Sequence, residues 1–181
     1  LKDAAAWDLV KVANERVKYN VDRIKEIVRL IKGYARNDFK ESYRPVSLRS
    51  VLDDSLLLLN HSLHVDGIKV KTEFPNLDYE FSGSFVQMSQ VVVNLISNAR
   101  DACRESKNKE VTVGYTRKQD RIEVWVEDSG AGIAQDYYNE IFKPFFTTKE
   151  LGKGTGLGLS ICKSIVDRHK GEIGFKSYGH N

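Results

Sequence analysis

The sequence predicts an α/β fold, in which helices pack on a sheet, preceded by one long helix. Segments with apolar residues three or four positions apart, as in helices, are interspersed with segments in which every second residue is apolar, as in strands. A helical pattern without proline also extends over residues 4–36. In addition, six of the 13 glycines lie within residues 128–158, which predicts a loop that approaches a ligand closely.

The composition is that of a soluble globular protein. Of the 181 residues, 41% are hydrophobic and 29% are charged, and the net charge is +3 because 28 basic residues are interspersed with 25 acidic ones. This balance favours neither nucleic acid nor an anionic membrane as a partner. No apolar run approaches the roughly 18 residues that span a bilayer, and no secretory signal is visible. We therefore expect a cytoplasmic location and no membrane contact by this chain, although a parent protein could be membrane-anchored.

The two cysteines and the chain start add two expectations. Cys103 and Cys162 lie in apolar helical contexts without C-x-x-C spacing, so both are expected to be buried thiols rather than metal ligands. The chain begins at Leu1 and its only methionine is Met88, which suggests a fragment of a longer protein.

The first segment is expected to pair with another chain. The apolar positions of the helical pattern form one stripe: Leu9, Ala13, Val17, Val21, Ile24, Ile27, Val28, Ile31 and Tyr34. A single helix cannot bury such a stripe alone, and a homodimer is the favoured solution. Residues 37–45 are polar and end in Arg44-Pro45, which stops the helix. The predicted domains are therefore 1–44, a helix with its linker, and 45–181, a globular domain.

The globular domain is predicted to begin with a helix and two strands. Ser47 is a plausible N-cap for a helix over residues 48–64, because its hydroxyl can accept a hydrogen bond from a free N–H group of the first turn. Residues 68–74 alternate as a strand, and residues 79–81 are expected to pair with it.

A second helix is predicted over residues 85–105, capped by Ser84. At a hundred degrees per residue, its buried face is expected to consist of Met88, Val92, Leu95, Ala99, Ala102 and Cys103. Asn94, Asn98 and Asp101 fall together on the shoulder beside that face. A helix that lines a cleft would carry its polar groups at such a shoulder.

The remaining elements are a hairpin, a helix and a final strand. Residues 111–117 and 121–127 alternate cleanly and predict the hairpin, which leads into Asp128. A helix is expected over residues 156–169, closed by Gly171, and a strand over residues 172–177. A further partner strand for this last one is expected to be missing.

The glycine-rich stretch favours phosphate as a ligand. Its second cluster, residues 152–158, leads directly into the last helix, whose free N–H groups and dipole attract anions. The P-loop and dinucleotide-binding motifs are absent, as are the signature motifs of protein kinases.

Four boxes together closely resemble the ATP-binding domain of sensor histidine kinases, which belongs to a superfamily shared with gyrase, MutL and an ATP-driven chaperone. They read QVVVNLISNARDA (residues 90–102), DSGAGI (128–133), IFKPFFTTK (141–149) and GKGTGLGLS (152–160). The resemblance implies a two-layer α/β sandwich of the Bergerat type, with a mixed sheet and helices on one face. It also implies that the N-terminal helix is the second helix of a dimerising hairpin.

The resemblance implies a role for each site residue. Asn98, with Asn94 one turn earlier, would hold the Mg²⁺ that bridges the ATP phosphates, and Asp128 would accept a hydrogen bond from the adenine amino group. Lys149 is favoured over Lys153 as the γ-phosphate contact, because it ends the Thr-Thr-Lys run. The full set of expected nucleotide contacts is Asn94, Asn98, Asp101, Asp128, Gly130, Gly132, Ile133, Thr148, Lys149, Gly152, Lys153, Gly154, Thr155, Gly156, Leu157 and Gly158.

The implied reaction is transfer of the ATP γ-phosphoryl group to a histidine on the hairpin and then to an aspartate of a response regulator. No histidine here shows the acceptor motif: His61, His64, His169 and His180 all lack the acidic residue that usually follows. Two other functions stay open, a non-catalytic nucleotide-binding scaffold and an ATP-operated clamp. A serine or threonine kinase of the same superfamily is a weaker option.

Overall fold

A computed structural model of the chain describes residues 43–150 and 154–178, together with seven helical residues nearer the N-terminus: Trp7, Val10, Lys11, Ala13, Asn14, Val17 and Val21. The apolar side chains among these seven are exposed, with Trp7 at 73% and Val17 at 60%. The rest of the predicted dimerisation helix lies outside the described residues. Within the described residues, no helix combines the length and the apolar character needed to cross a membrane.

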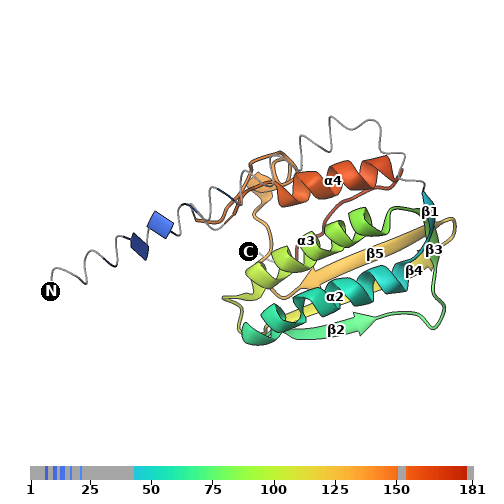
Figure 1. The fold of residues 1–181 in the computed structure, drawn as a ribbon, viewed down its shortest axis with the longest axis horizontal. Helices are drawn as coiled ribbons and strands as arrows, with labels where there is room; N and C mark the ends of the chain where they lie inside the picture. Colours follow the sequence, from blue (N-terminus) through green and yellow to red (C-terminus); the bar gives the residue numbers. More distant parts are fainter. Residues whose placement is uncertain are drawn as a thin grey trace.

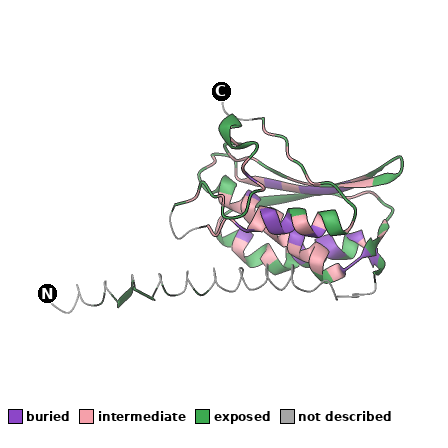
Figure 2. Cartoon of the chain, turned by 90° about the horizontal axis from the view of Figure 1, so that it is seen from above, coloured by how far each residue is buried: buried purple, intermediate pink, exposed green. Residues whose placement is uncertain are grey.

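The domain has two layers, with its helices on one face of the sheet (Figure 1). Seen from above, the buried residues gather where the helices and the strands face each other (Figure 2). The elements in chain order are β1 (Arg44–Ser47), α2 (Leu48–Val65), β2 (Lys69–Glu73), β3 (Glu80–Gly83), α3 (Phe85–Cys103), β4 (Glu110–Lys118), β5 (Arg121–Asp128), the 3-10 turn η1 (Gln135–Tyr137) and α4 (Gly158–Arg168).

The main sheet is mixed, as expected. Its strand order is β2-β4-β5, with β2 and β4 parallel and β4 and β5 antiparallel. The predicted pairing of residues 79–81 with residues 68–74 is wrong, because β3 instead pairs with β1 in a separate two-stranded sheet. The segment between β2 and β3 returns to the start of α2, where its residue Tyr79 accepts a hydrogen bond from the Leu48 N–H at 2.9 Å. Strand propensity alone cannot tell which strand will be the partner.

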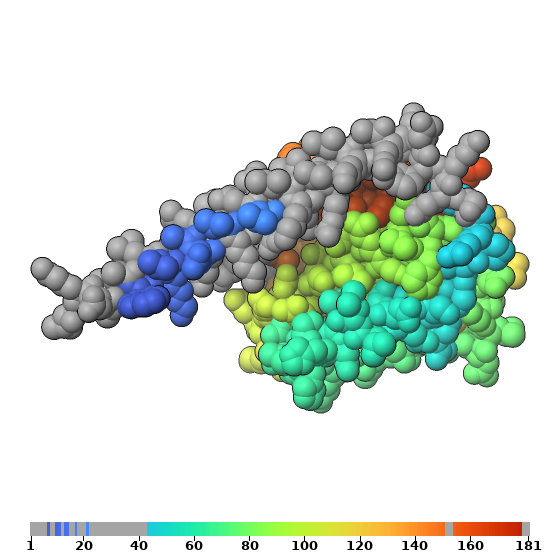
Figure 3. All heavy atoms as spheres, in the orientation of Figure 1, coloured from blue at the N-terminus to red at the C-terminus, as the bar shows by residue number. Residues whose placement is uncertain are grey.

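Both predicted N-caps are confirmed. The Ser47 hydroxyl accepts from the Ser50 N–H, and the Ser84 hydroxyl accepts from the Gln87 N–H. The helices α2 and α3 therefore start at the residues that the capping pattern indicated, and they run side by side on the face shown in Figure 3.

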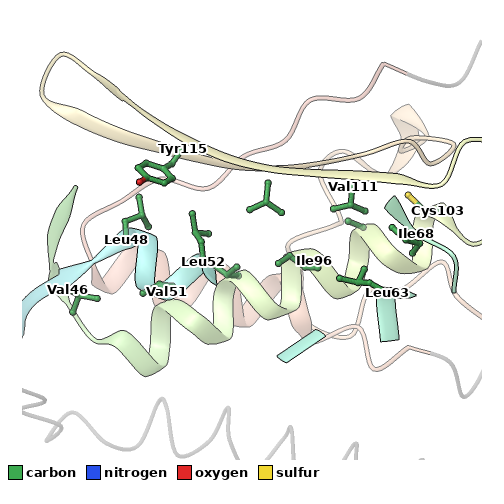
Figure 4. Close-up of a cluster of buried hydrophobic side chains, with 13 residues drawn as sticks. Val46, Leu48, Val51, Leu52, Leu63, Ile68, Ile96, Cys103, Val111 and Tyr115 are labelled. Carbon is green, nitrogen blue, oxygen red and sulfur yellow. The ribbon is translucent and has the colours of Figure 1, made fainter. Parts of the chain in front are cut away.

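The larger hydrophobic core fills the space between α2, α3 and the sheet. Leu52 and Ile96 from the two helices lie opposite Val111 and Tyr115 of β4, and all four are at most 1% exposed (Figure 4). Alternate residues of β4 point into this core, which is why the strand has a period of two.

A smaller core lies on the other side of α3, against α4. It consists of Val91, Leu157, Ile161, Cys162 and Ile165. The helix α3 therefore buries two faces, whereas its helical periodicity predicted one. Val91 and Ile96 are buried although they were not predicted to be, and Ala102, which was predicted to be buried, is exposed.

The two cysteines are buried, as predicted. Burial raises the pKa of the Cys162 thiol to about 11, so the thiol stays protonated at neutral pH and its Sγ donates to the Val91 carbonyl at 3.8 Å. Cys103 donates in the same way to the Glu110 carbonyl at 3.3 Å. Both thiols thus tie α3 to a neighbouring element.

The C-terminal end of α4 is fixed by His169. Its Nε2 accepts from the Ser84 N–H at 3.1 Å, and its Nδ1 lies 2.8 Å from the Ile165 carbonyl, to which it must donate. Tyr43 stacks on the same ring at 4.9 Å, and its hydroxyl donates to the Arg168 carbonyl at 3.2 Å. His169 thereby joins the ends of α3, α4 and the segment before β1.

The predicted strand over residues 172–177 is wrong, because this segment has no regular secondary structure. Its described contacts are made by side chains instead. Phe175 packs against Tyr138 and Phe142, and the Ser177 hydroxyl accepts from the Ile133 N–H at 2.9 Å. Of its alternating residues, Ile173 packs against the smaller core of α3 and α4, whereas Phe175 and Ser177 contact the loop after β5.

Candidate functional site

The polar shoulder of α3 faces the start of α4. Asn94, Asn98 and Asp101 are each partly buried there. The Asn94 side-chain NH₂ donates to the Gly158 carbonyl at 3.4 Å, which leaves the amide oxygen available. Within the described part of the chain, the Asn98 side chain makes no hydrogen bond, so its oxygen and its NH₂ group can both serve a ligand.

Asp128 ends β5 in a tight turn. Its Oδ1 accepts from the Gly130 N–H at 2.9 Å, which is the hydrogen bond of an Asx turn. A Cβ at residue 130 would lie 2.8 Å from the Cβ of Ala102 and 2.7 Å from the Asp128 Oδ1. Glycine is needed at this position because the turn approaches α3 closely, and that approach brings Asp128 to the helix that carries Asn98.

Ser129 fixes this turn in place, a role that the sequence did not predict. Its N–H donates to the Glu110 carbonyl at 3.0 Å and its hydroxyl accepts from the Glu110 N–H at 2.9 Å. The Ser106 hydroxyl donates to the Ser129 carbonyl at 2.7 Å. A serine beside a glycine in a turn gives little signal in the sequence, since it is a common turn residue whatever its contacts.

The loop after β5 packs through its aromatic residues, but not all of them serve as anchors. Phe142 contacts Phe175, and Phe146 contacts Tyr137 at 5.4 Å between ring centroids. The sequence predicts that Phe142, Phe145 and Phe146 anchor this loop to the sheet. For Phe145 this prediction is wrong, because its side chain is 53% exposed and its φ is 68°. Its backbone instead supports Gly156.

Lys149 lies against the shoulder of α3. Its Nζ is 2.5 Å from the Asp101 Oδ2, and both side chains are about one-third exposed, at 34% and 28%. The backbone N–H of Lys149 donates to the Thr147 hydroxyl at 3.1 Å. Gly154 packs on this turn, since a Cβ there would lie 2.7 Å from the Thr147 Oγ1 and 3.1 Å from the Lys149 Cδ. Thr148, which lies between Thr147 and Lys149 in the sequence, is exposed.

The glycine-rich segment enters α4 through a left-handed turn. Gly156 has a φ of 68°, and the buried Leu157 follows it as the N-cap residue. The Thr155 hydroxyl accepts from the Leu157 N–H at 3.4 Å. The first intrahelical bond runs from the Ile161 N–H to the Leu157 carbonyl, so the N–H groups of the first turn remain available for an anion.

Most of the predicted site residues therefore meet in space. Three contacts close the site from different sides: Asn94 to Gly158, Gly130 to Ala102, and Lys149 to Asp101. Gly132 has a φ of 81° and turns the chain away after Asp128, and Ile133 is held by Ser177. Gly152 and Lys153 lie outside the described residues.

A large cavity lies elsewhere and shares none of these residues. Its volume is about 580 Å³, and Asp78, Glu80, Arg117, Asp120 and Arg121 are among the residues that line it. Arg121 begins β5 and Asp128 ends it, so the cavity and the Asp128 turn lie at opposite ends of this strand. Its lining mixes both charges and contains no glycine.

The chain is similar to known histidine kinases. Residues 83–180 match the family described as "Histidine kinase-, DNA gyrase B-, and HSP90-like ATPase". The sensor kinase CckA of Brucella abortus is 34% identical over 172 residues, which cover 87% of this chain and 18% of that protein. The chain spans a similarly small share, 17%, of the sensor histidine kinase TmoS of Ectopseudomonas mendocina.

Solved structures of histidine kinases are similar as well. The catalytic domain of the histidine kinase ThkA superposes with a TM-score of 0.62 at 28% identity, covering 70% of this chain and 81% of that one. ThkA in complex with the response regulator protein TrrA gives a TM-score of 0.66 at 26% identity, covering 86% of this chain and 43% of that one.

Proposed function

Because the chain belongs to the histidine kinase-, DNA gyrase B- and HSP90-like ATPase family and contains the ATP-binding catalytic domain of a two-component sensor histidine kinase, we propose that it transfers the ATP γ-phosphoryl group to a histidine. The acceptor would be carried by a helical hairpin and would pass the group to a response regulator aspartate, a partner suggested by the complex of ThkA with TrrA. The convergence of the α3 shoulder, the Asp128 turn and the start of α4 carries this proposal.

Each wall of the site would contact a different part of the nucleotide. We assign adenine to Asp128, whose carboxylate can accept a hydrogen bond from the exocyclic amino group and would reject guanine. The N–H groups at the start of α4, with the glycines before it, would receive the phosphates. Lys149 would contact the γ-phosphate. Phosphoryl transfer needs little more than positioning and charge neutralisation, so the proposal assigns no general base to the described residues of the site.

The residues present suit Mg²⁺ bound together with ATP. The described residues contain no group of three or more His, Cys, Asp or Glu side chains able to hold a metal. Mg²⁺ is commonly held by one or two protein oxygens together with phosphates and water, so a site of this kind needs no such cluster. The amide oxygens of Asn98 and Asn94 are the protein ligands we propose. When bound, the ion would neutralise charge on the phosphates.

The three described histidines are poor acceptors of a phosphoryl group. Both ring nitrogens of His169 are already hydrogen-bonded, and neither His61 nor His64, exposed on α2, is followed by an acidic residue. We therefore propose that this chain binds ATP without phosphorylating itself. In the parent protein, the N-terminal helix would form a homodimer and so bring an acceptor hairpin to the site.

Two measurements test the proposal. Calorimetric titration with Mg²⁺-ATP should give binding. Asn98→Ala should weaken this binding at least about tenfold, because the amide oxygen of residue 98 no longer contacts the Mg²⁺ ion. Asn60→Ala, which changes an exposed asparagine on α2, is the matched control and should leave the affinity unchanged.

Incubation with γ-labelled ATP and a separately supplied hairpin protein should then label the hairpin with an acid-labile, alkali-stable phosphate. Binding without transfer would support the scaffold function instead. Labelling of this chain itself would contradict the proposal that it does not phosphorylate its own histidines.

A further inference from the structure

The ion pair between Lys149 and Asp101 occupies the lysine that the proposed function assigns to the γ-phosphate. At 2.5 Å between Nζ and Oδ2, the contact is a charge-assisted hydrogen bond. An ammonium group has three N–H donors, but a carboxylate and a phosphate that share it repel each other, so this short contact must lengthen when Lys149 takes up a γ-phosphate. A contact with the nucleotide therefore requires the ion pair to break or to stretch.

Asp101 has a second cation that would remain if Lys149 left. Its other oxygen, Oδ1, lies 3.8 Å from the Arg104 Nε. Arg104 also lies 3.5 Å from Asp66, which is held by Arg100 at 2.6 Å. The carboxylate of Asp101 thus stays next to a guanidinium that α2 and α3 hold in place, and it would not be left without a counter-charge.

The turn that carries Lys149 has its own support. The Thr147 hydroxyl holds the Lys149 backbone N–H, and Gly154 packs on the same turn. The backbone can therefore stay in place while the four-carbon side chain of the lysine swings between two anions.

From this geometry we propose that Asp101 is an exchange partner for Lys149 rather than a nucleotide contact, and that it lowers the preference of the site for ATP over ADP. This inference rests on the proposed function. ATP binding must break or stretch the ion pair for Lys149 to reach the γ-phosphate. ADP has no γ-phosphate and binds with the pair intact. Once the γ-phosphoryl group has left, Lys149 returns to Asp101, so the product state regains the ion pair.

The test compares affinities for a non-hydrolysable ATP analogue and for ADP. Asp101→Asn should tighten binding of the analogue about two- to fivefold, because a partly exposed ion pair contributes a few tenths to one kcal/mol, and it should leave ADP affinity unchanged. In a Lys149→Gln background the same change should have no effect, since there is no lysine to release.

Glu105→Gln is the matched control. This substitution also removes one negative charge, from an exposed side chain that lies shortly after Asp101 in the sequence. This control should change neither affinity, and equal circular dichroism spectra should confirm that all variants are folded. If Asp101→Asn weakens binding of the analogue, or tightens ADP and the analogue equally, the exchange is refuted and Asp101 acts as a direct contact or through its general charge.

Failure of the exchange and failure of the proposed function give different results. If the unaltered chain binds neither ADP nor the analogue, the nucleotide site itself is refuted, and the exchange with it. If the unaltered chain binds both and Asp101→Asn behaves like Glu105→Gln, only the exchange is refuted.

Discussion

Glycine is required for different reasons at different points of the site. Gly156 needs its positive φ and also lies against the Phe145 backbone, whereas Gly130 is needed because Ala102 leaves no room for a side chain. Gly67, just after the α2 C-cap, also has a positive φ, of 70°, but nothing lies within 4 Å of the place where a Cβ would be. The sequence shows that Gly130 and Gly156 belong to one glycine-rich stretch, but not which requirement each one meets.

Gly67 and Gly156 allow the two requirements to be measured separately. Gly67→Ala should lower the free energy of unfolding by about 1–2 kcal/mol, which is the ordinary cost of a left-handed backbone for alanine. Gly156→Ala should lower it by more than that, because the new Cβ also meets the Phe145 backbone, and it should weaken nucleotide binding. Urea unfolding of both variants, followed by circular dichroism, gives the comparison. Equal losses of stability would contradict the close packing of Gly156 on Phe145.

At the scale of secondary structure, α3 organises the domain because it packs on two sides. Its larger contact is with α2 and the sheet, and its smaller one is with α4. The shoulder that carries Asn94 lies between these two contacts, which explains why it is only half-buried. The helical periodicity predicted that the asparagines lie beside the buried face, and they are half-buried, but it did not predict the burial of Val91. The neighbour of Val91 comes from a helix more than sixty residues later in the chain.

Asp66 links the ends of α2 and α3. The hydrogen bond from the Arg100 guanidinium holds the pKa of the Asp66 carboxyl below its usual value. A lowered pKa in the folded state means that the carboxylate stabilises the fold above its unfolded pKa of about 3.9, and that this contribution is lost as the pH falls through the folded value. The tie between the two helices is therefore sensitive to acid and not to base.

Asp66→Asn should test this directly. The variant should be less stable than the original chain at pH 6, and the difference should shrink as the pH falls below about 4. Thermal unfolding at a series of pH values gives the measurement. Asp54→Asn, which changes an exposed carboxylate of α2 that forms no ion pair among the described residues, should show no such trend. A difference that stays constant down to pH 2 would show that the carboxylate charge is not what stabilises the link.

At the scale of the whole molecule, the described buried apolar residues all lie between Val46 and Ile165. The described residues of the N-terminal segment are exposed instead, and Trp7, Val10 and Val17 present apolar surface. The described residues from 43 onward thus contain a hydrophobic core, and we propose that the exposed apolar residues before them contact another chain.

Removal of residues 1–42 should separate these two roles. The shortened chain keeps Tyr43 on His169, so it should fold, remain monomeric and bind Mg²⁺-ATP within about twofold of the longer chain. The longer chain should be a dimer if the N-terminal helix pairs as proposed. Sedimentation equilibrium and calorimetry make the comparison. A shortened chain that is unfolded, or that still dimerises, would contradict this division.

The sequence by itself determined the local features. The caps at Ser47 and Ser84, the hairpin that leads into Asp128 and the boxes of the nucleotide site were predicted because each depends on neighbours within a few residues or on a motif of fixed spacing. Period and capping are short-range properties, so they can be recognised in the order of the residues.

Only the tertiary structure decided which elements became neighbours. It paired β3 with β1, left residues 172–177 without a partner strand, gave α3 a second buried face, and placed Lys149 on Asp101. These outcomes depend on contacts between residues far apart in the chain, and the pattern of a segment does not encode the identity of its partner. The ion pair of Lys149 was hidden for the same reason, because forty-eight residues separate it from Asp101.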